Sequence, residues 1–196
     1  MAMSNRQVEF GTLLNRVSAE VATIMWEAYV HHTPMTETTV TQYILREVQK
    51  EATYIQVSTP NEAQTGADWQ WIILNSAGQR TTVLCQAKIL DPQTGTYPHL
   101  AHKVGGLGGP QQVDTLLAYA HLQNAEAFYV LYNYTLYDER VTEANNKNNG
   151  CFVVGAADMK GQIDTYVASP YVDTTSLSWA EIKQYASPLR EFIRFA

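Results

Sequence analysis

The sequence predicts an α/β fold. The hydrophobic periodicity gives the order helix, strand, strand, strand, helix, strand, and 45% hydrophobic residues are enough to bury a core. A length of 196 residues suits a single domain. Within it we distinguish an N-terminal helical extension at 1–34, a core at 35–160 and a C-terminal helical segment at 161–196.

Two amphipathic helices open the pattern. Apolar residues recur at helical spacing over 6–30, and Pro34 ends that stretch. Thr36 is a suitable N-cap for a second helix, and Glu37 falls in its first turn. The buried stripe expected on this second helix consists of Val40, Tyr43, Ile44 and Val48.

Three strand-like runs follow, and a short loop at 75–78 makes the last two a hairpin. The runs are 53–59, 67–74 and 80–88. After a loop at 90–110, Pro110 is expected to open a helix, and a β-prone run covers 128–134.

The remainder of the chain is less regular. Residues 138–150 are polar and predict a loop, and 151–155 predict a further strand. Ser178 and Glu181 have the spacing of a capping box, which indicates a late helix.

Composition excludes several classes. The net charge of −6 argues against a protein that coats nucleic acid through bulk charge. No apolar run is long enough to span a membrane, and the first residues do not resemble a secretory signal. The two cysteines, Cys85 and Cys151, form no CxxC pair, so we expect neither a disulfide framework nor structural zinc, and a cytoplasmic location.

The candidate chemistry lies at the ends of two predicted strands. Asp68 begins one strand, and Gln86 and Lys88 share a face at the end of the next. A hairpin between these strands brings the three together. A carboxylate, a second oxygen ligand and a lysine suit a Mg²⁺ site for phosphodiester hydrolysis.

These residues resemble the PD-(D/E)XK nuclease superfamily, in its Gln-x-Lys variant typical of Mrr-type restriction enzymes. The chain also resembles a family of small bacterial proteins within that superfamily, over about residues 35–160. The shared stretches are 36–38 (TET), 65–69 (TGADW) with Trp71, 86–88 (QAK), 95–100 (GTYPHL), 112–114 (QVD) and 129–133 (YVLYN).

The resemblance implies a restriction-endonuclease-like core, with a central mixed β-sheet flanked by helices. It implies that Asp68, Gln86 and Glu37 bind Mg²⁺ or Mn²⁺, that Lys88 is the catalytic lysine, and that Gln112 lies near the site. The implied activity is hydrolysis of nucleic acid, with DNA as the expected substrate, and the implied setting is bacterial defence or DNA processing.

Each residue also has a purely structural interpretation. Asp68 suits a turn, Lys88 a solvated strand end, and Glu37 the favourable end of a helix dipole, while Gln112 equally suits a backbone contact. Gln86 replaces the usual acid, which predicts weaker Mg²⁺ binding and leaves open a non-catalytic module that binds nucleic acid or protein.

Other motifs carry weaker signals. His99 and His102 lack further metal ligands nearby in sequence, so hydrogen bonding or phosphate contact is favoured. The glycine-rich run 105–109 has no following Lys-Ser/Thr, which argues against a nucleotide triphosphate site. No Gly-x-Ser-x-Gly elbow is present.

The local charge differs from that of the whole chain. Between residues 80 and 112, three cations against one carboxylate leave +2, which suits local phosphate contact. A further alternative is an obligate subunit or homodimer that docks through the helix at 6–30.

Overall fold

The computed structural model describes residues 4–33, 35–75, 77–104, 109–134, 150–167 and 176–195. The chain forms an α/β fold with a mixed six-stranded sheet in the order β1-β2-β3-β5-β6-β8. The helices are α1 (Asn5–Val30), α2 (Glu37–Glu51), α3 (Glu62–Thr65), α4 (Gln112–Gln123), α5 (Ala156–Val167) and α6 (Trp179–Ile182), with the 3₁₀ helix η2 (Leu189–Phe195). The strands are β1 (Ile55–Ser58), β2 (Trp69–Leu74), β3 (Arg80–Ile89), β4 (Thr96–Tyr97), β5 (Glu126–Asn133), β6 (Gly150–Gly155), β7 (Leu177–Ser178) and β8 (Ser187–Pro188).

This architecture confirms the predicted α/β class and the predicted order of the core elements. α2, β1, β2, β3, α4 and β5 follow one another in the expected sequence. The sheet is mixed because β3 and β5 are parallel, whereas the other neighbouring strands of the six are antiparallel. The loop after β2 makes β2 and β3 a hairpin, with Gly78 at a φ of 76°.

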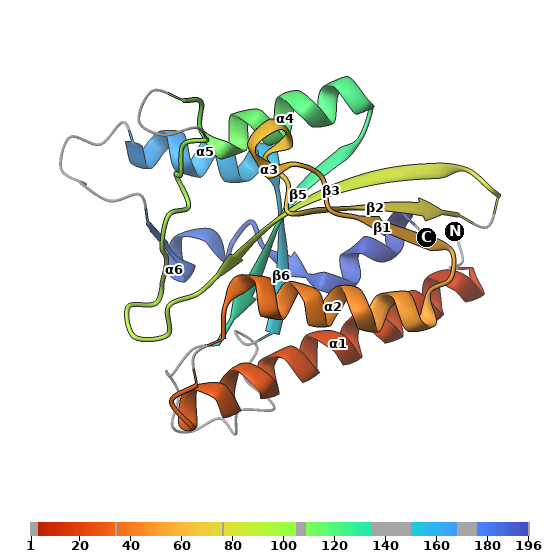
Figure 1. Ribbon diagram of the computed structural model, residues 1–196, viewed down its shortest axis with the longest axis horizontal. Coiled ribbons are helices and arrows are strands. Elements are labelled where there is room, and N and C mark those ends of the chain that lie inside the picture. The colour runs from red at the N-terminus through yellow and green to blue at the C-terminus, as the bar shows by residue number, and fades with distance from the viewer. Residues whose placement is uncertain are drawn as a thin grey trace.

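The helices cover the two faces of the sheet (Figure 1). α1 and α2 lie on one face and α4 and α5 on the other. Alternate residues of β3 therefore enter different cores: Cys85 and Ala87 face α1 and α2, whereas Leu84 faces α4 and α5.

The face under α1 and α2 is apolar and rich in aromatic rings. Trp71 packs edge-on against Phe10 of α1 and Phe192 of η2, with ring centroids 6.3 and 5.3 Å away. Trp69 is also fully buried there, on the face of β2 opposite Asp68. The long first helix is thus part of this core, and η2 packs against it.

Two predicted boundaries were wrong. The C-terminal segment 161–196 is not uniformly helical in its described part, because α5 begins at Ala156 and the strands β7 and β8 follow it. The capping box of Ser178 and Glu181 does open a helix, as predicted, although α6 has only four residues. The two-residue strand β8 pairs with β6 and adds an edge to the sheet. α4 begins at Gln112 rather than Pro110. Of the predicted loop at 138–150, all but Gly150 lies outside the described residues.

Two findings bear on the expected setting. In the described part of the chain, no helix is both long and apolar enough to cross a membrane. Cys85 and Cys151 are free thiols and are buried in the core under α1 and α2.

Candidate functional site

The β2–β3 hairpin brings Asp68 beside Gln86. The backbone N–H of Asp68 donates to the Cys85 carbonyl at 2.9 Å, which fixes Asp68 at the start of β2. Its Oδ2 atom accepts hydrogen bonds from the backbone N–H of Ala87 at 2.7 Å and from Gln86 Nε2 at 2.6 Å. The carboxylate is therefore held against the end of β3 by two donors.

Lys88 and Glu37 complete a charged group at this end of the sheet. Lys88 follows Gln86 on the same face of β3 and is only 8% exposed. Glu37 begins α2, where the Thr36 hydroxyl caps the helix by accepting from Thr39 N–H. The Glu37 carboxylate accepts a hydrogen bond from the Ile89 backbone, so it lies next to the end of β3.

Burial raises the pKa of both carboxyl groups. The pKa of Asp68 rises from 3.8 to about 6, although the Ala87 hydrogen bond and the charge of Lys88 lower it. Burial raises the pKa of Glu37 from 4.5 to about 7, with Lys88 lowering it and Asp68 raising it. The positive charge of Lys88 thus offsets only part of the negative charge of Asp68 and Glu37. Such a site favours an additional cation.

Gln112 lies at the start of α4 and is linked to the charged group through Glu62. Its Nε2 donates to Glu62 Oε1 at 2.5 Å, and its backbone N–H donates to the His102 carbonyl at 2.8 Å. Glu62 raises the pKa of both Asp68 and Glu37, so Gln112 reaches the site through Glu62. The sequence analysis missed Glu62, and the only local signal was Asn61, which caps α3 through Ala63 N–H.

Gly66 sets the distance between Asp68 and α4. Its φ is 67°, and a Cβ atom there would lie 2.6 Å from both Gln112 O and Leu116 N. Both contacts are with backbone, which cannot rotate away as a side chain does. Only glycine therefore lets the turn before Asp68 approach α4 this closely.

Several buried polar atoms on this side of the sheet have no hydrogen-bond partner, among them Gln86 Oε1, Gln112 Oε1, Tyr129 Oη and Asn133 Nδ2. Tyr129 stands beside Gln86 in the parallel β3–β5 register. Burial raises the pKa of Tyr129 well above its ordinary value, and nearby carboxylates, Asp68 first, raise it further. Because buried polar groups are nearly always hydrogen-bonded, this side of the sheet suits ordered water or an ion.

The oxygen donors at this end of the sheet are of the type that a hard cation prefers. Within the described residues, no three His, Cys, Asp or Glu side chains cluster closely enough to hold a metal. A Mg²⁺ or Mn²⁺ ion bound here would need the amide oxygen of Gln86 in addition to the carboxylates of Asp68 and Glu37. The Gln86 amide presents its NH₂ group to Asp68 and would turn over to present Oε1, the atom that now lacks a partner.

The weaker motifs remain outside this group. His99 and His102 are both exposed, and His99 has a φ of 59°. Residues 105–108 of the glycine-rich run lie outside the described residues. Neither motif adds a described ligand to the carboxylates.

Fold and site together define a mixed α/β protein with a charged group of Asp68, Gln86, Lys88 and Glu37 at one end of its sheet. The chain belongs to DUF6615, described as a family of unknown function, whose model matches residues 11–195. No curated protein matches the sequence.

Proposed function

We propose that this protein is a metal-dependent nuclease of the PD-(D/E)XK type, which hydrolyses phosphodiester bonds in DNA. The observation that carries the proposal is the meeting of Asp68, Gln86 and Lys88 at one end of the β2–β3 hairpin, with Glu37 beside them. The order of the core elements, from α2 to β5, agrees with the resemblance in sequence.

Each residue has a role that its surroundings allow. Asp68 and Glu37 would hold Mg²⁺ or Mn²⁺ through carboxylate oxygens, and Gln86 would add its amide oxygen. When bound, the metal would neutralise charge on the phosphate and lower the pKa of an attacking water. Lys88 is positioned on the same face to stabilise negative charge that develops on the phosphate oxygens. Gln112 keeps Glu62 turned toward the site.

The proposed setting is a cytoplasmic role in bacterial defence. Two buried, unpaired cysteines agree with a reducing compartment. Bacterial defence follows only from the resemblance.

The test is cleavage of single- and double-stranded DNA and RNA with Mg²⁺ or Mn²⁺. We expect Asp68→Ala and Lys88→Ala each to reduce cleavage about a hundredfold or more, the usual cost of losing one electrostatic contact to a transition state. The matched controls are Asp164→Ala and Lys183→Ala, two exposed residues outside the site. Cleavage unchanged in both site variants would overturn the assignment.

One observation favours a second function, a non-catalytic binding module on the same fold. Gln86 already donates to Asp68, so the pair is satisfied in part without a metal. Titration calorimetry with Mg²⁺ separates the two functions. Millimolar Mg²⁺ that neither binds nor supports cleavage would favour the module.

A further inference from the structure

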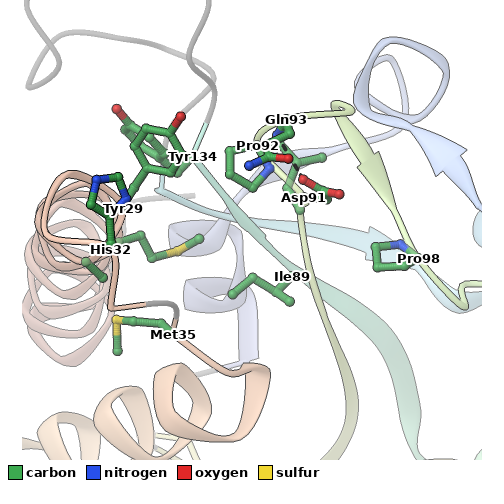
Figure 2. A pocket seen from close by; sticks show the side chains of 12 residues that line it. Tyr29, His32, Met35, Ile89, Asp91, Pro92, Gln93, Pro98 and Tyr134 are labelled. Atoms are coloured by element: carbon green, nitrogen blue, oxygen red, sulfur yellow. Dashed lines mark hydrogen bonds between the residues drawn. The ribbon is translucent and has the colours of Figure 1, made fainter.

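A cavity opens beyond the end of β3, between the end of α1 and the turn after β3 (Figure 2). It has a volume of about 490 Å³, within the range of pockets that bind small organic ligands. One wall is the end of α1, with Tyr29 and His32, followed by Met35. The opposite wall is the turn after β3, including Pro92 and Gln93, and Ile89 lies between the walls.

The walls of this cavity suit a flat aromatic ligand. The rings of Tyr29 and Tyr134 lie 5.9 Å apart with planes 40° apart, at one side of the opening. Tyr29 is 37% exposed, so its ring is accessible, whereas Tyr134 is 4% exposed and anchors the pair. Aromatic side chains of this kind are the usual stacking partners of unpaired nucleobases.

Polar groups stand opposite the rings. Asp91 and Gln93 line the cavity from the turn after β3, with Asp91 Oδ1 accepting from the Gln93 backbone N–H at 2.8 Å. The Asp91 backbone also pairs with Thr96, which holds this turn in place. A carboxylate and an amide can bond the amino groups and ring nitrogens at the edge of a base.

At two places, a residue that lines the cavity is close in sequence to a residue of the candidate site. Ile89 lines the cavity, while its backbone N–H donates to Glu37 and the preceding Lys88 belongs to the charged group. Met35 lines the cavity two residues before Glu37. These two places in the chain, Met35 before Glu37 and Ile89 after Lys88, are the link between the cavity and the charged group on which the proposal depends.

We propose that this cavity binds an unpaired nucleobase of the substrate, next to the phosphate held at the charged group. This inference rests on the proposed function and narrows it to single-stranded nucleic acid, or to a duplex from which one base is extruded. The base stacks on Tyr29, and Asp91 and Gln93 contact its edge. The protein would then select nucleic acids in which the base next to the bound phosphate is unpaired, in addition to binding the phosphate itself.

The experiment locates the base directly. Single-stranded oligodeoxynucleotides that carry iododeoxyuridine are bound to the full chain with Ca²⁺ in place of Mg²⁺ or Mn²⁺, so that a cation can balance the carboxylates of Asp68 and Glu37 while cleavage is slowed. They are then photo-crosslinked, and the modified residue is mapped by mass spectrometry. We expect the crosslink at Tyr29 or Tyr134. In parallel, anisotropy with a fluorescent oligonucleotide should show a loss of affinity of about tenfold for Tyr29→Ala, within the 1–3 kcal/mol typical of base stacking.

Two variants serve as controls. Tyr29→Phe keeps the ring and should bind as the wild type does. Tyr185→Ala removes a tyrosine of nearly equal exposure, 38%, that does not line this cavity, and should also bind normally. Crosslinks elsewhere, or wild-type affinity in Tyr29→Ala, would overturn the nucleobase site.

The outcomes separate this inference from the proposed function. Cleavage with Mg²⁺ without a crosslink at Tyr29 or Tyr134 would overturn the nucleobase site and leave the proposed nuclease activity unaffected. Crosslinking at Tyr29 without cleavage supports the cavity and favours the binding module. A protein that binds no oligonucleotide overturns both.

Discussion

Both faces of the central sheet bury an apolar core, but they differ at the end of β3. Under α1 and α2, Trp69 and Trp71 join a continuous aromatic core. Under α4, the same sheet carries Gln86 and Lys88, both buried, and leaves the Gln86 oxygen without a partner.

We expect the aromatic face to contribute mainly to stability and the polar end of the other face to reduce it. Burial of aromatic rings contributes most of the stabilising energy that a face can supply. Unpartnered buried polar atoms reduce stability on both faces, since Trp69 Nε1 and Trp71 Nε1 also lack partners. What distinguishes the end of β3 on the α4 side is the partly compensated charge of Asp68 and Glu37 beside Lys88, which is the basis of the candidate site.

The largest effect is expected from breaking the aromatic face. Trp71→Ala removes a fully buried ring between Phe10 and Phe192, and should lower the free energy of unfolding by about 3–5 kcal/mol. Urea denaturation measures the change. Leu122→Ala, at a residue 78% exposed, should change it by less than about 0.5 kcal/mol. Equal losses in the two variants would contradict the view of this face as the stabilising one.

The next effect concerns the contact between the turn before Asp68 and α4. Gly66→Ala adds a Cβ atom 2.6 Å from two backbone atoms of α4, at a φ of 67°. We expect a loss of about 2–4 kcal/mol, because the left-handed conformation and the displaced helix both cost energy.

Gly78→Ala is the matched control for this prediction. Gly78 has a similar φ of 76°, but nothing lies within 4 Å of a Cβ atom built there. It should lose only the conformational cost of about 1 kcal/mol. Thermal melts measure the loss of stability in each variant. Equal losses in Gly66→Ala and Gly78→Ala would show that the turn at Gly66 does not pack tightly against α4.

The sequence predicted much of this arrangement and missed specific parts of it. Gln86 and Lys88 were paired with Asp68 from strand alternation and hairpin pairing alone, because both rules are local. Glu62 was missed because its contact with Gln112 spans 50 residues. β8 was missed because two residues carry no periodicity, and the cavity at Tyr29 depends on which loop faces the end of α1.

The third prediction tests the cost of the two half-buried carboxylates. Their pKa values in the folded protein, about 6 for Asp68 and about 7 for Glu37, exceed the ordinary 3.8 and 4.5. The folded state therefore binds these protons more tightly than the unfolded chain. The resulting loss of stability is absent below about pH 4, grows through the two folded pKa values and is complete near pH 8.

Neutral isosteres should remove this loss. Asp68→Asn and Glu37→Gln should each raise the free energy of unfolding at pH 8 by on the order of 2 kcal/mol, and should change it little at pH 4. The double variant should gain less than the sum, because Asp68 and Glu37 repel each other. Urea denaturation across this pH range provides the measurement, and a gain that is independent of pH would contradict the assignment.

The smallest effect tests whether Gln86 contacts the proposed metal. In Gln86→Glu, a carboxylate replaces the amide that now donates to Asp68 at 2.6 Å. Without metal, the new charge repels Asp68, so the variant should be less stable than the wild type at pH 8. With metal, opposite charges about 4 Å apart attract by about 4 kcal/mol at an effective dielectric of 20, before desolvation.

We therefore expect Gln86→Glu to bind Mg²⁺ or Mn²⁺ about tenfold more tightly, since desolvation offsets most of the attraction. Calorimetry at pH 8 measures the affinity, and a thermal melt confirms that the variant is folded. Gln86→Leu is the control, because it fills similar space without an oxygen ligand and should bind more weakly than the wild type. Equal affinity in all three folded proteins would mean that Gln86 only holds Asp68 in place. The metal would then depend on Asp68 and Glu37 alone.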